Sequence, residues 1–539
     1  MIILYKVEFS IYIESSTKQQ VNLFSMPKNR FNWPAFRAFL HTVLDQHIHH
    51  SNEHEYVAIS LPVPMQTNND LAKRLVTSKP TFYLSHPTNS FTIVGQGALE
   101  RVSTSGSNRF HRTSALGKNL FNRVHHFNSL SRPYPLQLLG GFSFFNTLKK
   151  NSEWADFEPS LFHLPEWTIV KTKDEATLSL IERINDFETV DNLVNKFQDK
   201  LYSWTNHNPY DSTYINGNVE HNKKLLSTFL PSKIDSSFTT NPQTLGNQPG
   251  NIRAFTAWKK MVIKAKKAFD AKELKKVVLA RKVTQSLSQK PKAADVISNL
   301  EQQYPDCFVF CVNPKGDSYF IGATPERLAR FTPTQVETES LAGSSMRGKT
   351  YEEDDDLAGK LLNSKKDRLE HQIVIEAIEE DLVPYSERME HSSSPQVKKL
   401  PNVQHLYTPI SAIFKKGVSR TNVLKDLHPT PAVGGFPREK ALEFIEKEES
   451  FTRGWYASPI GWINSHGTGE FYVAIRSGLI EKNTAHFYAG CGIVEDSDPK
   501  NEWMETELKF KPMVDAVRIA TRVQESPPLE KHYAKDPIL

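Results

Sequence analysis

The sequence is poor in the features that mark membrane and secreted proteins. No run approaches the roughly 20 apolar residues that a bilayer-spanning helix needs. The N-terminal MIILYKVEFSIYIESS is a short apolar run interrupted by acidic residues, without the basic start of a signal peptide. Only three cysteines occur, Cys307, Cys311 and Cys491, and none are spaced as CxxC. Three cysteines cannot all pair within one chain, so we expect a reduced, cytoplasmic protein. Cys307 and Cys311 lie in an apolar run, which predicts core packing rather than metal binding.

The sequence also has little net charge. The 66 Lys and Arg residues exceed the 61 Asp and Glu residues by only five over 539 residues. No dense Arg/Lys stripe occurs, so the sequence does not indicate a nucleic-acid partner. The weak positive bias would suit an anionic small molecule. The length is sufficient for a large core and more than one lobe.

Composition divides the chain into four stretches. Residues 1–45 carry no usable motif. Residues 46–250 begin with short β-like runs such as YVAISLPV, FYLSH and FTIVGQGAL and end, over 205–250, in a segment rich in Asn, Ser, Thr, Pro and Gly. That composition is typical of a linker or a long surface excursion. Residues 251–520 are more strongly patterned, and residues 521–539 form a tail.

Apolar periodicity predicts an α+β fold. Strands are predicted in LQLLGGFSFF, FHLPEWTIVKT, KKVVLARKVTQSL, CFVFCV, DSYFIGAT, GEFYVAIRSGLI and HFYAGCGIV. Apolar residues at helical spacing predict helices over 176–204, 255–269, 351–383 and 437–449. Gly140 and Gly141, inside the first of these strands, suggest a bulge or a close approach of two backbones. Hairpin-like strands mixed with helices favour the α+β class.

Two pairs of carboxylates stand three residues apart on predicted helices. Asp367 and Glu370 lie in DRLEHQIVIEAIEEDL, and Glu502 and Glu505 lie in NEWMETELK. Side chains three residues apart share a helix face, and two such pairs together could hold a hard cation such as Mg²⁺. The plainer interpretation is that each pair belongs to a solvated helix face, and periodicity alone favours it.

A lysine and a glutamate stand at the ends of predicted strands. Lys276 opens the apolar run VVLA, where partial desolvation would suit a general base. Glu326 follows Thr324 and Pro325 in FIGATPERLARF, where burial against apolar strands would suit a general acid with a raised pKa. Alternatively, Lys276 extends to solvent and Glu326 forms an exposed ion pair with Arg327.

A glycine-bearing run could bind an anion through its backbone. Gly490 and Gly492 in FYAGCGIV would let N–H groups approach an anion closely. Their spacing is not that of a phosphate loop, so a nucleotide is not indicated. Arg476 and Lys509 are candidate partners for a carboxylate, Arg476 through two parallel hydrogen bonds. Either could equally be a surface charge.

Taken together, these segments resemble the chorismate-utilising enzymes. The resemblance is carried by eight motifs in the family's order: KVVLAR (276–281), GATPERL (322–328), LAGSSMRG (341–348), DRLEHQIV (367–374), LHPTPAVGG (427–435), AIRSGLI (474–480), YAGCGIV (488–494) and EWMETELK (502–509). It is strong over residues 250–520 and weak over residues 80–170. It implies a large two-sheet αββα-type sandwich, as in anthranilate synthase component I, with a deep central site.

The resemblance also implies a role for each matching residue. Lys276 would be the base that activates water, and Glu326 the acid that protonates the departing hydroxyl group. The implied Mg²⁺ site consists of the ligands Glu370 and Glu505, with Glu502 and Asp367 behind them. The implied contacts to the substrate chorismate are Gly343, Ser344, His428, Tyr456, Arg476, Gly490, Cys491, Gly492 and Lys509.

The activity that the resemblance implies is that of an isochorismate synthase, of the kind that serves menaquinone synthesis. Water would attack ring C2 of chorismate and the C4 hydroxyl would leave. Lys276 is typical of family members that add water, and Ala342 stands where aminodeoxychorismate synthases carry a lysine. No glutamine amidotransferase subunit is expected. A salicylate synthase, which also eliminates pyruvate, and a non-catalytic chorismate-binding protein stay open as alternatives.

Overall fold

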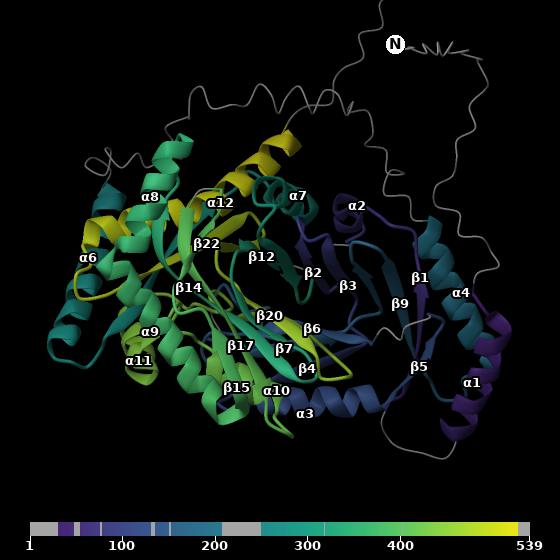
Figure 1. Ribbon diagram of the computed structural model, residues 1–539. Coiled ribbons are helices and arrows are strands. Elements are labelled where there is room, and N and C mark those ends of the chain that lie inside the picture. The colour runs from purple at the N-terminus through teal and green to yellow at the C-terminus, as the bar shows by residue number, and fades with distance from the viewer. Residues whose placement is uncertain are drawn as a thin grey trace, which may run out of the picture.

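The described part of the chain forms two large sheets flanked by helices (Figure 1). A computed structural model describes residues 31–47, 54–75, 78–130, 135–149, 152–206, 249–316, 318–401 and 403–525. Nearly all of the predicted linker over 205–250 and most of the predicted tail lie outside these ranges.

One sheet has twelve strands. In order across the sheet they are β18 (Gly435–Phe436), β10 (Lys276–Ser286), β22 (Thr484–Ile493), β21 (Ser477–Glu481), β12 (Ser318–Thr324), β11 (Phe308–Asn313), β2 (Thr81–His86), β3 (Phe91–Gln96), β8 (Trp167–Lys171), β9 (Ala176–Arg183), β1 (Tyr56–Pro62) and β5 (Val124–Asn128). Strands β1 and β5 run parallel, and the other neighbours in this sheet run antiparallel.

The other sheet has ten strands. Its order is β15 (Ser386–His391), β17 (Val403–Phe414), β14 (Gln335–Met346), β13 (Arg327–Phe331), β20 (Gly469–Val473), β19 (Pro459–Asn464), β6 (Gln137–Phe142), β7 (Ser160–Leu164) and β4 (Glu100–Thr104), and β16 (Gln396–Lys399) also pairs with β17. Predominantly antiparallel pairing in both sheets confirms the α+β class.

Helices cover the outer faces of the two sheets (Figure 1). On the twelve-stranded side lie α1 (Trp33–His47), α2 (Asn68–Lys73), α4 (Val190–Asn206), α7 (Ala293–Gln303) and α12 (Pro499–Glu525). On the ten-stranded side lie α3 (Arg109–Asn122), α8 (Tyr351–Asn363), α9 (Lys365–Leu382) and α10 (Arg420–Leu427). Helices α6 (Pro249–Asp270) and α11 (Arg438–Glu448) pack near β10. The expected αββα sandwich is confirmed.

The helix predicted over 176–204 is wrong in its first third, where β9 lies. Leu178 and Leu180 point into the core under the outer helices, and Ile181 points into the core between the sheets. A strand buried on both faces shows no clean alternation of apolar and polar residues, so its sequence can be mistaken for a helical pattern. The rest of the predicted helix corresponds to α4.

Two other predicted elements are split. The helix predicted over 351–383 breaks at Ser364, whose Oγ accepts a hydrogen bond of 3.2 Å from the N–H of Asp367 and caps α9. The single strand predicted in GEFYVAIRSGLI is β20 followed by β21, and these strands belong to different sheets. The chain therefore crosses from one sheet to the other inside this motif.

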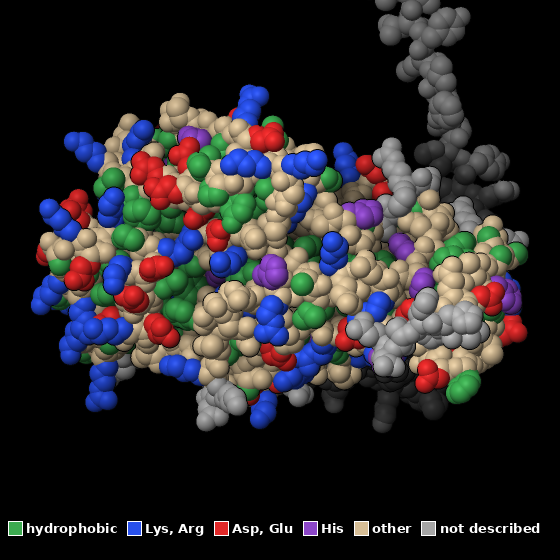
Figure 2. Space-filling model, turned by 90° about the horizontal axis from the view of Figure 1, so that it is seen from below, with side chains coloured by type: hydrophobic (Ala, Val, Ile, Leu, Met, Phe, Trp, Pro, Cys, Tyr) green, Lys and Arg blue, Asp and Glu red, His purple; other side chains and the backbone are tan. Residues whose placement is uncertain are grey.

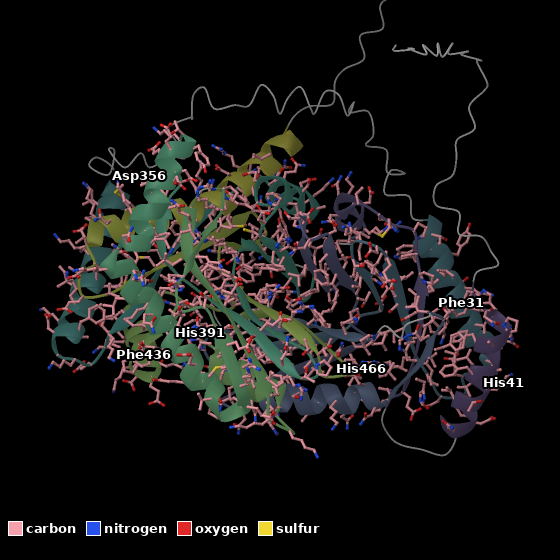
Figure 3. All side chains as sticks on the ribbon, in the orientation of Figure 1. Phe31, His41, Asp356, His391, Phe436 and His466 are labelled. Atoms are coloured by element: carbon pink, nitrogen blue, oxygen red, sulfur yellow. The ribbon has the colours of Figure 1, made fainter. Side chains whose placement is uncertain are left out.

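The two halves of the sequence share both sheets. Strand β2 pairs with β11, where Ser85 faces Val309, and β6 pairs with β19, where Gly141 faces Ile460. The predicted boundary near residue 250 therefore separates stretches of sequence, not independent bodies. Within the predicted N-terminal extension, α1 packs beside α4 and β5 at one end of the molecule, where Figure 3 labels Phe31 and His41.

The surface and the cysteines agree with the composition. All three cysteines are free and buried, which confirms the core packing predicted for Cys307 and Cys311. Acidic and basic side chains are interspersed over the face shown in Figure 2. In the part of the chain that the structure describes, no helix has both the length and the apolar character that crossing a membrane requires.

The packing around Gly140 explains why β6 contains a pair of glycines. A Cβ on Gly140 would lie 2.0 Å from the carbonyl oxygen of Leu161 on β7, which confirms the predicted close approach of backbones. We expect Gly140→Ala to lower the free energy of unfolding by about 1–3 kcal/mol or more, because the strands must separate. The measurement is equilibrium denaturation.

Gly359→Ala is the matched control for this substitution. Gly359 lies in α8 with nothing within 4 Å of its added Cβ. Alanine should stabilise the helix there by roughly 0.5–1 kcal/mol. Equal stability of the two variants would contradict the packing argument.

Candidate active site

One pocket collects residues from both sheets and from helices α9 and α12. Residues singled out from the sequence that line it are Glu326, Gly343, Ser344, Glu370, Tyr456, Arg476, Gly490, Cys491, Gly492, Glu505 and Lys509. Motifs from distant parts of the sequence therefore meet in one cavity.

Glu326 and Arg476 lie on two neighbouring crossings between the sheets. The chain passes from β12 to β13 through Glu326, and it returns from β20 to β21 through Arg476. The crossings bond to each other directly: Thr324 Oγ1 donates to the Val473 carbonyl (2.6 Å), and the Val473 N–H donates to the Glu326 carbonyl (3.1 Å). The N–H of Ala323 donates to the carbonyl of Arg476 at 3.1 Å. Hydrogen bonds between the crossings thus fix both residues.

Arg476 is a buried cation in an unusual backbone conformation. Its φ of 51° lies in the left-handed region, which costs an arginine free energy. Its side chain is buried, and among the described residues no carboxylate lies within ion-pair distance of it. Burial lowers the pKa of its guanidinium. A buried cation without an acidic partner favours binding of an anion.

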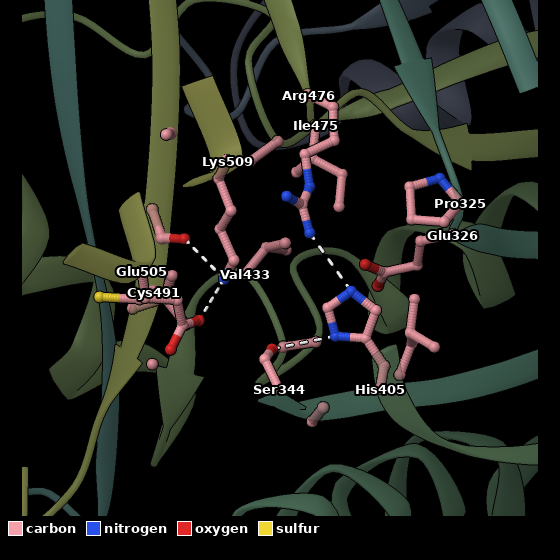
Figure 4. Close-up of a pocket in the computed structure, with 18 of the residues that line it drawn as sticks. Pro325, Glu326, Ser344, His405, Val433, Ile475, Arg476, Cys491, Glu505 and Lys509 are labelled. Atoms are coloured by element: carbon pink, nitrogen blue, oxygen red, sulfur yellow. Dashed lines mark hydrogen bonds and ion pairs between the residues drawn. The ribbon is translucent and has the colours of Figure 1, made fainter. Parts of the chain in front are cut away.

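His405 is a pocket residue that the sequence analysis missed. Its Nε2 lies 3.3 Å from Nη2 of Arg476, which can only donate, so Nε2 accepts and Nδ1 carries the proton. Nδ1 lies 2.9 Å from Ser344 Oγ and 3.3 Å from the carbonyl of Gly343 (Figure 4). Burial and the nearby Arg476 and Lys509 hold the pKa of His405 well below its usual value. The neutral ring therefore connects Arg476 to β14.

A bulge in β14 sets this arrangement. The register between β14 and β17 shifts at Gly343, whose φ is 77°, and this places Ser344 opposite His405. In the sequence, the segment QHLY (404–407) that contains His405 looks like any other strand segment. Only the β14–β17 register could have revealed that His405 belongs to the site.

Glu326 is a buried carboxylic acid. It is 4% exposed, and burial, reinforced by the negative charge of Glu339, raises its pKa to about 8 despite the opposing lysines at 398, 276 and 509. Its carboxyl group is therefore largely protonated at neutral pH. Figure 4 shows it on the side of the pocket opposite Lys509 and Glu505. The exposed ion pair with Arg327 that the sequence left open does not form, since Arg327 pairs with Glu470 instead.

Lys276 is buried and forms an ion pair with Glu370. Its Nζ lies 2.9 Å from Oε1 of Glu370, so it does not extend to solvent. Burial alone would raise the pKa of Glu370, but Lys276, with Lys509 and Lys366, lowers it below its ordinary value. A Cβ on Gly492 would lie 2.4 Å from Glu370 Oε1 and 2.9 Å from Lys276 Cε. The glycine on β22 therefore leaves the space that this ion pair occupies.

Each carboxylate that α12 brings to the site also meets a lysine. Glu505 Oε1 lies 2.5 Å from Lys509 Nζ, which also donates to the Gly490 carbonyl at 3.0 Å. Glu502, which does not line the pocket, pairs with Lys366 of α9 at 2.8 Å. Glu502 and Lys366 therefore join the two helices that supply the acidic side chains.

The carboxylates of α9 and α12 lie close enough to repel one another. Burial raises the pKa of Glu502, and Glu505 raises it further. Asp367, which bonds to Ser364 behind the pocket wall, likewise has a pKa raised by burial, by Glu370 and by Glu505. Such a set of oxygen donors suits a hard divalent cation. Among the described residues, however, no three His, Cys, Asp or Glu side chains are grouped as a ready-made metal cage, because lysines hold the carboxylates.

Three other predicted contacts differ in kind. Tyr456 stacks on Tyr488 with ring centroids 5.4 Å apart. Cys491 lines the pocket, but its Sγ lies 3.5 Å from the carbonyl of Glu502, so its backbone rather than its thiol is available to a ligand. His428 is not among the pocket-lining residues. It ends α10 and is buried against the ring of Phe144 at 5.7 Å.

Comparison with known proteins identifies the family. The family described as "Chorismate binding enzyme" matches residues 40–518. The chain belongs to the chorismate-binding enzymes. It is 33% identical over 460 residues to isochorismate synthase MenF of Bacillus subtilis (strain 168), spanning 84% of this chain and 91% of that protein.

Two further similarities place the chain within this family. It is 43% identical over 252 residues to the salicylate biosynthesis isochorismate synthase of Pseudomonas aeruginosa, covering 47% of this chain and 52% of that protein. The solved structure of MenF, the menaquinone-specific isochorismate synthase from Escherichia coli, superposes with a TM-score of 0.63 at 24% identity, over 89% of this chain and all of that one. That likeness supports the fold of this chorismate-binding enzyme.

The raised pKa of Glu326 predicts a cost in stability at high pH. Its folded-state value of about 8 lies above the ordinary value of 4.5, so between these values the folded enzyme holds a proton that the unfolded chain releases. The free energy of unfolding therefore falls as pH rises through this window. Glu326→Gln should remove that loss and be more stable than the wild type at about pH 9.

Denaturation of both proteins at several pH values checks this prediction. The stability difference between Glu326→Gln and the wild type should grow from acid to alkaline pH. A difference that is independent of pH would show that Glu326 titrates normally.

Proposed function

We propose that this chorismate-binding enzyme is an isochorismate synthase. The observation that carries the proposal is that a buried acid with a raised pKa, Glu326, lines one pocket with Arg476, which has no carboxylate partner among the described residues. The amine of Lys276 is buried behind the pocket lining, against the lining residue Glu370. An acid, a base and an anion-binding group are what exchange of a ring hydroxyl on a carboxylate substrate requires. The relatives named isochorismate synthase support the same activity.

Chorismate carries two carboxylates, and we assign one to the cationic side chains of the pocket and the other to the inferred metal ion. Arg476 would bind one carboxylate through parallel hydrogen bonds, with Lys509 and the backbone around Gly490 and Gly492 nearby. His405 accepts from Arg476, which fixes the direction of the guanidinium. Tyr456 and Ser344 complete the walls. Binding through both carboxylates would hold the ring in one orientation.

The cofactor that we infer is Mg²⁺, held by Glu370 and Glu505 with Glu502 and Asp367 behind them. When bound there, it would neutralise the ring carboxylate and withdraw charge from the conjugated ring. In the structure Glu370 forms an ion pair with Lys276, and Glu505 forms an ion pair with Lys509. Both lysines would therefore be released when these carboxylates bond elsewhere.

Lys276 and Glu326 divide the proton transfers. The oxygen of water bonds to C2 of the ring while Lys276 takes a proton from it, and both ring double bonds shift by one position, from C1=C2 to C1=C6 and from C5=C6 to C4=C5. The C4–oxygen bond breaks, and Glu326 gives its proton to the departing hydroxyl, which leaves as water. Lys276 ends protonated and Glu326 ionised, so one proton must return from base to acid. Each transfer contributes roughly 10²–10⁴-fold to the rate.

The wider role that we infer follows the relatives. The match to MenF over most of the chain favours supply of isochorismate to menaquinone synthesis. A reduced cytoplasmic compartment agrees with three unpaired buried thiols. No glutamine amidotransferase partner is needed, because water rather than ammonia is the nucleophile.

Incubation with chorismate and Mg²⁺ is expected to give isochorismate with little salicylate or pyruvate. The final ratio of chorismate to isochorismate should be the same from either side, because the two are isomers with similar bonding. Chromatography over time at neutral pH measures this. Stoichiometric salicylate and pyruvate would instead identify a salicylate synthase, and binding without turnover would identify a non-catalytic binding protein.

Lys276→Gln tests the proposed role of Lys276 as the base in the same assay. Its amide can still donate to Glu370, so no carboxylate is left without a partner, but it cannot accept a proton from water. Turnover should be lost while chorismate still binds.

Removal of one carboxylate from the inferred metal site is expected to weaken Mg²⁺ binding. Glu505→Ala should raise the Kd for Mg²⁺ in calorimetry by about 10-fold or more and abolish turnover, whereas Asp515→Asn should leave both unchanged. Asp515 is the matched control because it lies on the same helix and pairs with Lys511 and Arg518 instead. EDTA should silence the wild type. Full activity in EDTA would show that these carboxylates are structural.

A further inference from the structure

The residue that carries the acid, Glu326, is held by an ion pair outside the pocket. Lys398 of β16 and Glu339 of β14 lie behind the crossing from β12 to β13, with Nζ and Oε1 3.4 Å apart. Neither lines the pocket. Glu339 is buried, and the ring of Tyr407 on β17 lies beneath the ammonium of Lys398 at 5.1 Å.

This pair bonds to the two peptide groups that flank Glu326. Lys398 Nζ donates to the carbonyl of Pro325 at 2.7 Å, on one side of Glu326. Glu339 Oε1 accepts from the N–H of Arg327 at 2.9 Å, on the other side. Within Glu326 itself, the N–H donates to Thr324 Oγ1 (3.2 Å) and the carbonyl accepts from the Val473 N–H (3.1 Å). Two of these four anchors belong to the ion pair.

We propose that the Lys398–Glu339 ion pair is a positioning device for Glu326, which fixes the peptide groups on both sides of that residue and so aims its carboxyl group into the pocket. The inference rests on the proposed role of Glu326 as the acid. A displacement of about 1 Å can reduce the rate about 100-fold, so loss of either anchor should reduce kcat. Substrate binding through Arg476 and Lys509 should change little, because these residues lie on other elements.

The same two residues act on Glu326 in opposite electrostatic senses. Burial raises the pKa of Glu326 and Glu339 raises it further, whereas Lys398 lowers it, as do Lys276 and Lys509 to a smaller extent. The charged or titratable groups that the described residues place around Glu326 are Glu339 on β14, Lys398 on β16, His405 on β17, Lys276 on β10, Cys491 on β22, Glu370 on α9, Tyr456 before β19, Arg476 on the second crossing, and Glu505 and Lys509 on α12. Loss of Glu339 and loss of Lys398 should therefore move the titration of Glu326 in opposite directions.

Two variants test the proposal. Glu339→Gln keeps an acceptor for the N–H of Arg327 but removes the charge, and Lys398→Met removes the donor to the carbonyl of Pro325. We expect kcat to fall about 10- to 100-fold in Lys398→Met with KM within about threefold. The alkaline limb of the pH–rate profile should move to lower pH in Glu339→Gln and to higher pH in Lys398→Met.

Glu337→Gln is the matched control. Glu337 lies two residues from Glu339 on the same strand and pairs with Arg330 at 3.5 Å. Its kcat and pH profile should equal those of the wild type. Three outcomes would overturn the proposal. They are a similar loss of kcat in this control, a kcat in Lys398→Met within about twofold of the wild type, and an alkaline limb that moves in the same direction in Glu339→Gln and Lys398→Met.

A measurement without turnover separates this proposal from the proposed function. The pH dependence of the stability difference between Glu326→Gln and its parent is measured in the wild-type and Glu339→Gln backgrounds. The pH at which this difference develops should be lower in the Glu339→Gln background, whatever reaction the enzyme catalyses. An unchanged pH overturns the coupling of Glu339 to Glu326, whereas a wild type that is inactive on chorismate overturns only the assigned reaction.

Discussion

The candidate site depends on two chain crossings that hold each other in place. Each sheet alone could carry strands and helices, but the pocket exists because the chain leaves the twelve-stranded sheet after Thr324 and returns to it after Val473. Hydrogen bonds join these crossings directly. Glu326 on the outward crossing and Arg476 on the return crossing therefore keep a constant relation. An acid and an anion-binding group held by backbone bonds need little reorganisation when a substrate arrives.

The carboxylates of the inferred metal site are paired with lysines, whereas the arginine of the pocket is not paired with a carboxylate. Glu370, Glu505 and Glu502 each meet a lysine, so the acidic residues are neutralised at short range. Among the residues that the structure describes, Arg476 has only the neutral ring of His405 as a side-chain partner. The net attraction for an anion is therefore concentrated at Arg476, where the chain crosses between the sheets. The strained backbone of Arg476 is tolerated because the crossing fixes it on both sides.

The sequence predicts those parts of the site that depend on local spacing. The carboxylates three residues apart on α9 and α12, the strand that opens with Lys276 and the turn that carries Glu326 were all visible as short patterns. His405 was not, because its place in the site comes from a bulge at Gly343 that sets the register of two strands. The family resemblance implied a substrate contact for His428, but His428 does not line the pocket and its ring packs against Phe144. The sequence also does not show that the chain changes sheets inside GEFYVAIRSGLI, because both halves of this motif have the pattern of a strand. Only the partners of a strand decide which sheet it joins.

The interleaving of the two halves has a consequence for synthesis of the chain. Strands β2 and β6 emerge from the ribosome early, but their neighbours β11 and β19 follow far later in the sequence. Until then these strands present unpaired edges, which are the parts of a β protein most prone to join a foreign strand. A nascent chain or a fragment that ends before β19 therefore lacks the native partner for one edge of β6. The same feature makes the enzyme a poor candidate for gene splitting at the polar segment near residue 250, although composition alone marks that segment as the natural place to cut.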